Sequence, residues 1–235
     1  MSQTAGASTG VFYAYAKTIN NDWCGRYMIT FATRDVADMW YRLVSDSVAA
    51  GYGRFAAVKR VSLQFYTHDD AGGNISETLN DGRVGNSLLG QVFFTLLNNK
   101  NSRVIDPIPV LNYTDHINGE SFYIRSVAQP DTYWYYDETE GTVFADRYRR
   151  SQFTINIVNK ARAPGTVIIG SDEIHITSAT GVNIGATNRA NQLGPSANPF
   201  PFLFSSFIRK DFQIGHLEQP PVKRNPGKGE RWELL

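Results

Sequence analysis

The side chains best suited to recognise a ligand lie in the aromatic run YWYYD, residues 133–137. Its high β propensity predicts a strand, and neighbouring side chains on a strand point to opposite faces, so two rings can enter the core while two face outward. We expect Trp134 or Tyr136 to face outward as a flat amphipathic platform. Such a ring stacks on the apolar C–H face of a neutral sugar. Burial of these rings in the core or in a subunit interface is the alternative.

Flanking loops are expected to supply polar partners for this platform. His68 and Asp69 lie in the glycine-rich, acidic loop of residues 67–85, and Arg149 lies in the basic cluster RYRR, residues 147–150. Toward sugar hydroxyl groups, His68 can donate or accept a hydrogen bond, Asp69 can accept one, and Arg149 offers a rigid fork of N–H donors. A cluster as short as RYRR also suggests phosphate contacts, but without support from other basic residues it is typical of a solvated face.

Catalytic and metal-binding patterns are weak throughout the chain. The G-x-S-x-G match at residues 6–10 lacks the preceding strand and following helix that a nucleophile elbow requires. Glu138 and Glu140 lie in a short hairpin that would leave them solvated, without the burial that raises the pKa of a catalytic acid. The polar residues at 68–74 have a spacing that fits neither an EF-hand nor a zinc site. We therefore predict no catalytic residues, no metal site and no cofactor.

Composition narrows the classes of partner and compartment. The chain has 235 residues with 23 basic and 22 acidic side chains, so its net charge of +1 favours neither nucleic acid nor an anionic membrane. Cys24 is the only cysteine, which excludes an intramolecular disulfide and fits a reducing compartment. The start of the chain has no signal segment, and no run approaches the roughly 18 apolar residues of a membrane helix. We expect a cytoplasmic protein, or one released by a non-classical route, without a nucleic-acid partner and without membrane insertion.

The predicted fold is mainly β, an antiparallel β-sandwich with one peripheral amphipathic helix, and a β-trefoil-like fold is the alternative. Alternating residues at 151–158 predict a strand with one core face and one wet face. The helix is predicted over residues 33–51, where Thr33 is a plausible N-cap and Trp40 lies centrally on an apolar stripe.

The domain boundaries follow from composition. Residues 1–10 are small and polar and predict a flexible N-terminus, residues 11–217 predict a single β-rich domain, and residues 218–235 predict an extended C-terminal arm. Because the arm ends on apolar residues, we expect Trp232 and Leu234 to dock on the same or a neighbouring subunit.

Several of these features together resemble the cytosolic lectins of fungal fruiting bodies. The features are the single cysteine, the β-rich body, YWYYD beside RYRRSQF, and polar loops such as NYTDHING. The Q-x-W repeat of ricin-type trefoils is absent, with RSQFTI as its nearest approach, which argues against a trefoil. The resemblance implies binding of a glycan or glycoconjugate without catalysis, a role in fungal defence, and a homo-oligomer in which several weak sites engage one surface.

Two other functions compete with this interpretation. A structural, self-assembling protein such as a jelly-roll coat subunit is favoured by the size of the chain and by NPFPFLFSSF, but no basic arm is present to neutralise a nucleic acid. A hydrolase that uses acidic-loop residues lacks a convincing set of nucleophile, base and orienting group.

Overall fold

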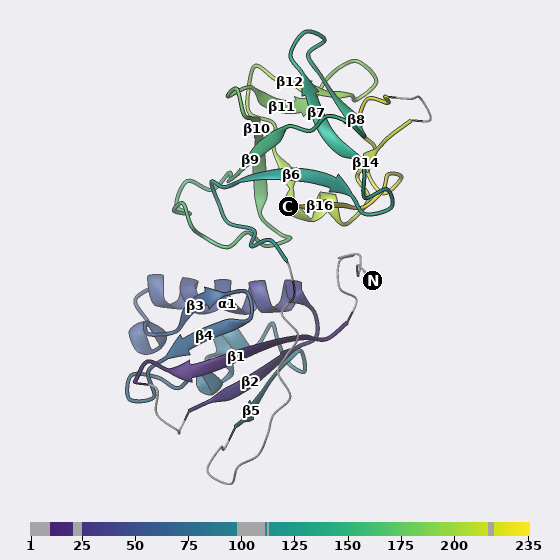
Figure 1. The fold of residues 1–235 in the computed structure, drawn as a ribbon. Coiled ribbons are helices and arrows are strands. Elements are labelled where there is room, and N and C mark those ends of the chain that lie inside the picture. Colours follow the sequence, from purple (N-terminus) through teal and green to yellow (C-terminus); the bar gives the residue numbers. More distant parts are fainter. Residues whose placement is uncertain (1–9, 21–24, 98–110, 112, 216–218) are drawn as a thin grey trace. The chain divides into compact units, whose positions relative to one another are not determined.

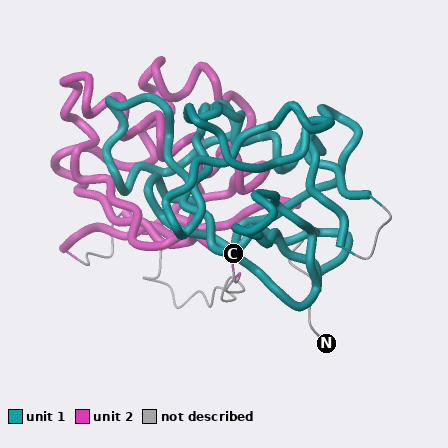
Figure 2. Tube along the Cα trace, turned by 90° about the horizontal axis from the view of Figure 1, so that it is seen from above, with its two compact units in different colours: residues 1–7, 116–235 teal, residues 8–115 magenta. Residues whose placement is uncertain are grey.

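The computed structural model describes residues 10–20, 25–97, 111, 113–215 and 219–235. It is 16% helical and 37% strand, which confirms the predicted mainly β class and is consistent with a β-sandwich. The chain divides at residue 115 into two compact units, which we call the N-terminal unit (residues 8–115) and the C-terminal unit (residues 116–235), as Figure 2 shows by colour. This division replaces the single domain expected over residues 11–217. Each unit has its own cluster of buried apolar side chains, and the sequence pattern does not reveal which strands share a core.

The N-terminal unit is built on a five-stranded sheet with strand order β3-β4-β1-β2-β5. Its strands are β1 (Phe12–Thr18), β2 (Tyr27–Phe31), β3 (Lys59–Ser62), β4 (Phe65–His68) and β5 (Val92–Leu96). The pair β1 and β4 is parallel, whereas the other neighbours are antiparallel. Side chains along β1 alternate between buried and more exposed positions, as expected for a sheet with one covered face.

The longest of the described helices, α1 (Arg34–Ala49), lies along this sheet in Figure 1. It begins where predicted, because Thr33 Oγ1 accepts a hydrogen bond from the Val36 N–H at 3.3 Å and so caps the first turn. Trp40 is fully buried, and its indole N–H donates to Thr78 Oγ1 at 3.0 Å. Thr78 belongs to the segment 67–85, which was predicted as a loop and contains short helices. The hydrogen bond from Trp40 shows that this segment packs against α1. The short helices of this unit are η1 (Gly53–Phe55), η2 (Ile75–Asn80) and α2 (Gly82–Gly85).

The C-terminal unit contains a nine-stranded sheet with the order β12-β11-β10-β9-β6-β7-β8, to which β13 and β16 are added through β10 and β6. Its elements are β6 (Ser121–Ser126), β7 (Tyr133–Asp137), β8 (Thr142–Asp146), β9 (Gln152–Ile157), β10 (Glu173–Ser178), β11 (Asn183–Ala186), β12 (Leu193–Pro195), β13 (Phe202–Leu203), η4 (Phe204–Phe207), β14 (Phe212–Gln213), β15 (Lys223–Arg224) and β16 (Trp232–Leu234). The predicted hairpin is present, because β7 pairs antiparallel with β8. The predicted alternation at residues 151–158 is likewise confirmed by the burial pattern of β9.

The end of the chain belongs to this unit and is not a separate arm. Strand β16 pairs antiparallel with β6, and Trp232 opposes Ser126 in that register. Trp232 is 2% exposed and Leu234 is 4% exposed, so both side chains are part of the core. Docking was expected on the same or on a neighbouring subunit, and the structure shows it on the same chain.

Candidate functional site

The aromatic platform predicted on β7 does not exist as expected. Trp134 is fully buried and Tyr136 is 7% exposed, whereas their neighbours Tyr133 and Tyr135 lie on the half-exposed face of the strand. The Trp134 ring lies edge-on to its neighbours, with its centroid 5.0 Å from that of Phe212. The rings of Phe153 and Trp232 pack around it in the same way. The alternation on β7 was predicted correctly, but its phase was wrong.

The outward tyrosines do not form an open platform either, because arginine side chains lie over their rings. The guanidinium carbon of Arg149 is 4.0 Å from the ring centroid of Tyr135. The guanidinium carbon of Arg150 is 4.5 Å from the ring centroid of Tyr123 and 5.4 Å from that of Tyr133. These contacts are cation–π pairs at the surface of the sheet.

The predicted polar partners His68 and Asp69 belong to the other unit, so neither unit holds all five predicted residues. His68 is fully buried, and its Nε2 lies 2.6 Å from the carbonyl oxygen of Gly25. Its Nδ1 lies 3.4 Å from the Ile75 N–H, so both ring nitrogens are used within the fold. Asp69 accepts a hydrogen bond from the Ala71 N–H at 3.1 Å and closes a local turn. His68 is therefore a structural residue, and its assignment as a ligand contact was wrong.

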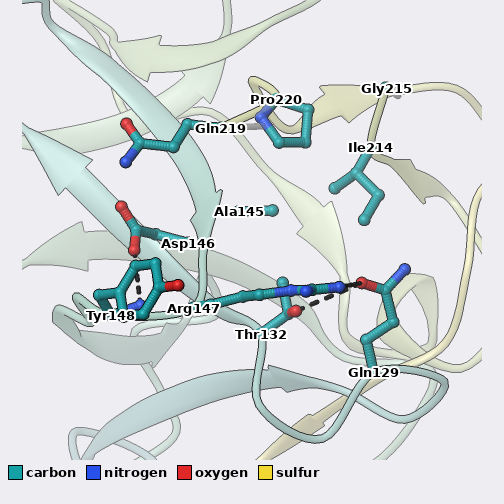
Figure 3. Close-up of a pocket in the computed structure, with 10 residues that line it drawn as sticks. All are labelled: Gln129, Thr132, Ala145, Asp146, Arg147, Tyr148, Ile214, Gly215, Gln219 and Pro220. Atoms are coloured by element: carbon teal, nitrogen blue, oxygen red, sulfur yellow. Dashed lines mark hydrogen bonds between the residues drawn. The ribbon is translucent and has the colours of Figure 1, made fainter. Parts of the chain in front are cut away.

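The C-terminal unit does contain a pocket, which we call the Tyr148 pocket (Figure 3). Its volume is about 400 Å³. It is formed by the end of β8, the turn after it, the loop before β7, and the segments on either side of residues 216–218. The described residues that line it are Gln129, Thr132, Ala145, Asp146, Arg147, Tyr148, Ile214, Gly215, Gln219 and Pro220.

The lining of this pocket combines apolar and polar surfaces. Ala145, Ile214 and Pro220 contribute the apolar part, and Figure 3 shows them along one side. On the opposite side the Arg147 side chain extends toward Gln129, to whose Oε1 it donates a hydrogen bond at 3.4 Å. The amide of Gln219 adds a further donor and acceptor. A ligand in this pocket would therefore meet both an apolar wall and several hydrogen-bonding groups.

Tyr148 gives the pocket an aromatic side chain that the rest of the fold hardly covers. Its exposed fraction is 91%, the largest among the described exposed large hydrophobic side chains. An exposed tyrosine offers a planar apolar ring and a hydroxyl group that can donate or accept. It follows directly on Arg147 in the turn after β8, so its backbone position is set by that turn.

Asp146 fixes the turn that carries Tyr148. Its Oδ1 accepts hydrogen bonds from the N–H of Tyr148 at 2.7 Å and from the N–H of Arg149 at 2.9 Å, while Oδ2 accepts from the Arg149 guanidinium at 2.9 Å. Burial raises the pKa of this carboxyl, but the hydrogen bonds from Tyr148 and Arg149 outweigh that effect and hold the pKa below its ordinary value. Asp146 is thus an ionised anchor of the turn.

Arg149, one of the five predicted residues, lies beside this pocket. Its guanidinium bonds Asp146 and also donates to Gln219 Oε1 at 3.1 Å, so it joins two of the lining residues. Tyr148 was not among the predicted residues, because RYRR is typical of a solvated face. The available signal was Asp146 itself, since an aspartate at a strand end commonly caps the N–H groups two and three residues later.

Other classes of site are not found in the part of the chain that the structure describes. No three His, Cys, Asp or Glu side chains are grouped there so that they could hold a metal ion. None of the helices in that part combines the length and apolar character needed to cross a membrane. A comparison of the chain with models of protein families and with curated proteins finds no match.

Proposed function

We propose that the C-terminal unit is a carbohydrate-binding module that holds a neutral glycan in the Tyr148 pocket without changing it chemically. The observation that carries this proposal is the 91% exposed Tyr148 ring beside a pocket with apolar and hydrogen-bonding walls. A sugar ring presents an apolar C–H face and a rim of hydroxyl groups. Tyr148 and Ile214 suit the first, and the amides of Gln129 and Gln219 suit the second.

The size and charge of the pocket support a small neutral ligand. A volume of about 400 Å³ lies within the range of roughly 300–1,000 Å³ that is usual for ligand pockets. Arg147 lies 3.6 Å from a carboxylate oxygen of Asp131, and Arg149 bonds Asp146, so both cations have acidic partners. Balanced charges of this kind give no preference for an anion.

The carboxylates around the pocket support binding more than hydrolysis. Asp146 is the one acidic side chain among the described residues that line the pocket, whereas glycoside hydrolysis commonly uses two. Its lowered pKa keeps it ionised at neutral pH, so it would not serve as the proton donor. We therefore favour a non-enzymatic role over the competing hydrolase function.

Assembly and location extend this proposal beyond the single site. A homo-oligomer, as expected from the sequence, would present several copies of the Tyr148 pocket to one glycan-bearing surface and raise the avidity. The lone Cys24 fits a cytoplasmic protein.

The test is a glycan array followed by calorimetric titration of the glycans that bind. Tyr148→Ala is expected to weaken binding by roughly 1–3 kcal/mol, the cost of losing a stacked aromatic contact or a buried polar partner. Its melting temperature should stay at the wild-type value because the ring is exposed. Tyr13→Ala, which removes a 38% exposed tyrosine from the other unit, is the matched control and should bind normally. The proposal is wrong if wild-type protein binds no glycan or if Tyr148→Ala binds as wild type does.

A further inference from the structure

The N-terminal unit has a pocket of its own, which we call the Tyr52 pocket. Its volume is about 390 Å³, close to the 400 Å³ of the Tyr148 pocket. It lies beyond the C-terminal end of α1, where η1 and α2 supply its walls. The residues that line it are Tyr52, Gly53, Arg54, Phe55, Asn80, Asp81 and Arg83, all of which belong to residues 8–115.

An anchored aspartate holds the rim of the Tyr52 pocket, as Asp146 does in the other unit. Asp81 Oδ1 accepts a hydrogen bond from the N–H of Arg83, two residues later, at 3.0 Å. The Arg83 guanidinium contacts both carboxylate oxygens at 2.9 Å, and Ser47 Oγ donates to Oδ2 at 2.9 Å. The backbone bond from Arg83 lowers the pKa of Asp81 most, the Ser47 and Arg83 side chains lower it further, and burial opposes them. Both rims thus carry an aspartate that is ionised at neutral pH and accepts a hydrogen bond from the N–H two residues after it.

An exposed tyrosine also borders this pocket, as Tyr148 borders the other. Tyr52 is 49% exposed, and the guanidinium carbon of Arg83 lies 3.1 Å from its ring centroid. This stacking holds the ring in place while half of the side chain stays open to solvent. Phe55 is 2% exposed and contributes apolar surface, and the exposed Asn80 contributes an amide donor and acceptor.

The charges of the Tyr52 pocket are balanced. Arg83 pairs with Asp81, and Arg54 forms an ion pair with Glu77. A pocket whose two cations are both matched by carboxylates offers no excess charge to a phosphate or sulfate group. Aromatic, amide and neutralised charged groups instead suit a neutral ligand with several hydroxyl groups.

We infer that the Tyr52 pocket is a second sugar-binding site, so that a single chain carries two sites, one in each unit. The ligand class rests on the function proposed for the Tyr148 pocket, whereas the pocket itself stands on its own geometry. Two sites in one chain would allow it to link two glycans without forming an oligomer. Where the spacing permits, binding at one site also raises the effective concentration of ligand at the other. The two sites differ in sequence and are therefore expected to prefer different glycans.

The test uses the full chain and five variants on the same glycan array. Tyr148→Ala is expected to retain a set of glycans that Tyr52→Ala loses, and the double variant is expected to bind neither set. Tyr52→Ala also removes the contact of the ring with Arg83 and could disturb the fold. A second variant therefore tests the same pocket and keeps Tyr52. Gly53→Trp adds an indole at a lining position where an added Cβ meets no atom within 4 Å, and it is expected to block the pocket. Tyr13→Ala is the control for loss of an exposed tyrosine, and circular dichroism checks the fold of each variant.

The outcomes separate this inference from the proposed function. If Tyr148→Ala abolishes all binding while Tyr52→Ala and Gly53→Trp bind as wild type does, the Tyr52 pocket is no sugar site and the proposed function stands. If Tyr148→Ala changes nothing while Tyr52→Ala and Gly53→Trp abolish binding, the Tyr52 pocket is the sugar site and the proposed function is wrong. Wild-type protein that binds no glycan overturns both. Calorimetry with a glycan that binds both sites should give a stoichiometry near two ligands per chain, which falls to about one in either single variant.

Discussion

Asp146 Oδ1 accepts a hydrogen bond of 2.7 Å from the backbone N–H of Tyr148. This bond holds the backbone of the residue that carries the most exposed of the described large hydrophobic side chains. The second carboxylate oxygen holds the Arg149 side chain at 2.9 Å. One buried carboxylate therefore holds the backbone at Tyr148 and the guanidinium of Arg149, which follow each other in the turn. A site placed on such an anchored turn loses less conformational entropy on binding than one placed on a free loop.

Replacement of Asp146 should therefore impair both binding and stability. In Asp146→Ala the N–H groups of Tyr148 and Arg149 and the Arg149 guanidinium lose their acceptor. We expect a loss of roughly 1–3 kcal/mol in the free energy of unfolding and weaker glycan binding, because the turn is released. Urea unfolding and calorimetric titration measure the two effects. Asp131→Ala removes a 63% exposed carboxylate from the same unit and should change neither property by more than about 0.5 kcal/mol.

The contribution of Asp146 should disappear in acid. Its pKa in the folded chain is lowered, so the carboxylate stabilises the fold fully above its unfolded pKa of about 3.9. This stabilisation is lost as the pH falls through the folded pKa, which lies lower still. Urea midpoints of wild type and Asp146→Asn should thus differ most near pH 7 and converge below about pH 4. A difference that stays constant down to pH 3 would mean that the ionised carboxylate is not the stabilising species.

The sequence predicted the elements of this protein better than their faces. Thr33 and the stripe through Trp40 located α1, since a cap and a 3.6-residue period are local signals. No local signal of this kind predicts which face of β7 enters the core. Residues 133–136 are aromatic on both faces, so alternation alone cannot say whether Trp134 or Tyr135 enters the core. That choice depends on Phe153, Phe212 and Trp232, which lie on other strands and pack against the Trp134 ring.

The candidate site was harder to predict than the fold for a related reason. Tyr148 stands among arginines, and a short charged stretch in a sequence resembles any solvated turn. Its pocket is completed by Gln129 and Gln219, which lie 90 residues apart in the chain. Pockets made by such distant segments have no local sequence pattern, whereas the aspartate that anchors the turn does.

Trp134→Ala should act on folding and not on a ligand. The indole is fully buried among aromatic rings, with Phe212 5.0 Å and Trp232 5.6 Å away between ring centroids. Its removal leaves a large cavity, and we expect a loss of about 3–5 kcal/mol in the free energy of unfolding. Tyr135→Ala on the outward face of the same strand should cost less, since that ring is only half-buried. A Trp134→Ala variant as stable as wild type that no longer binds glycans would restore the original platform interpretation.

The last strand of the chain should be essential to the C-terminal unit. Deletion of residues 230–235 removes β16, which pairs with β6 and brings Trp232 into the core at 2% exposure. It also removes the Glu230 carboxylate, which accepts a hydrogen bond from Ser126 Oγ at 2.7 Å. Strand β6 would then lose backbone partners and apolar cover together, so we expect the melting temperature to fall and the Tyr148 pocket to lose its ligand.

Two point variants separate the causes of that effect. Trp232→Ala keeps the strand but opens a cavity and should cost about 3–5 kcal/mol. Glu233→Ala removes only a half-buried ion pair with Arg125, whose closest N–O distance is 2.6 Å, and should cost about 1 kcal/mol or less. Thermal melts followed by circular dichroism rank the three variants. If the deletion variant melts at the wild-type temperature, the core does not depend on β16, and β6 is stable as an edge strand without it.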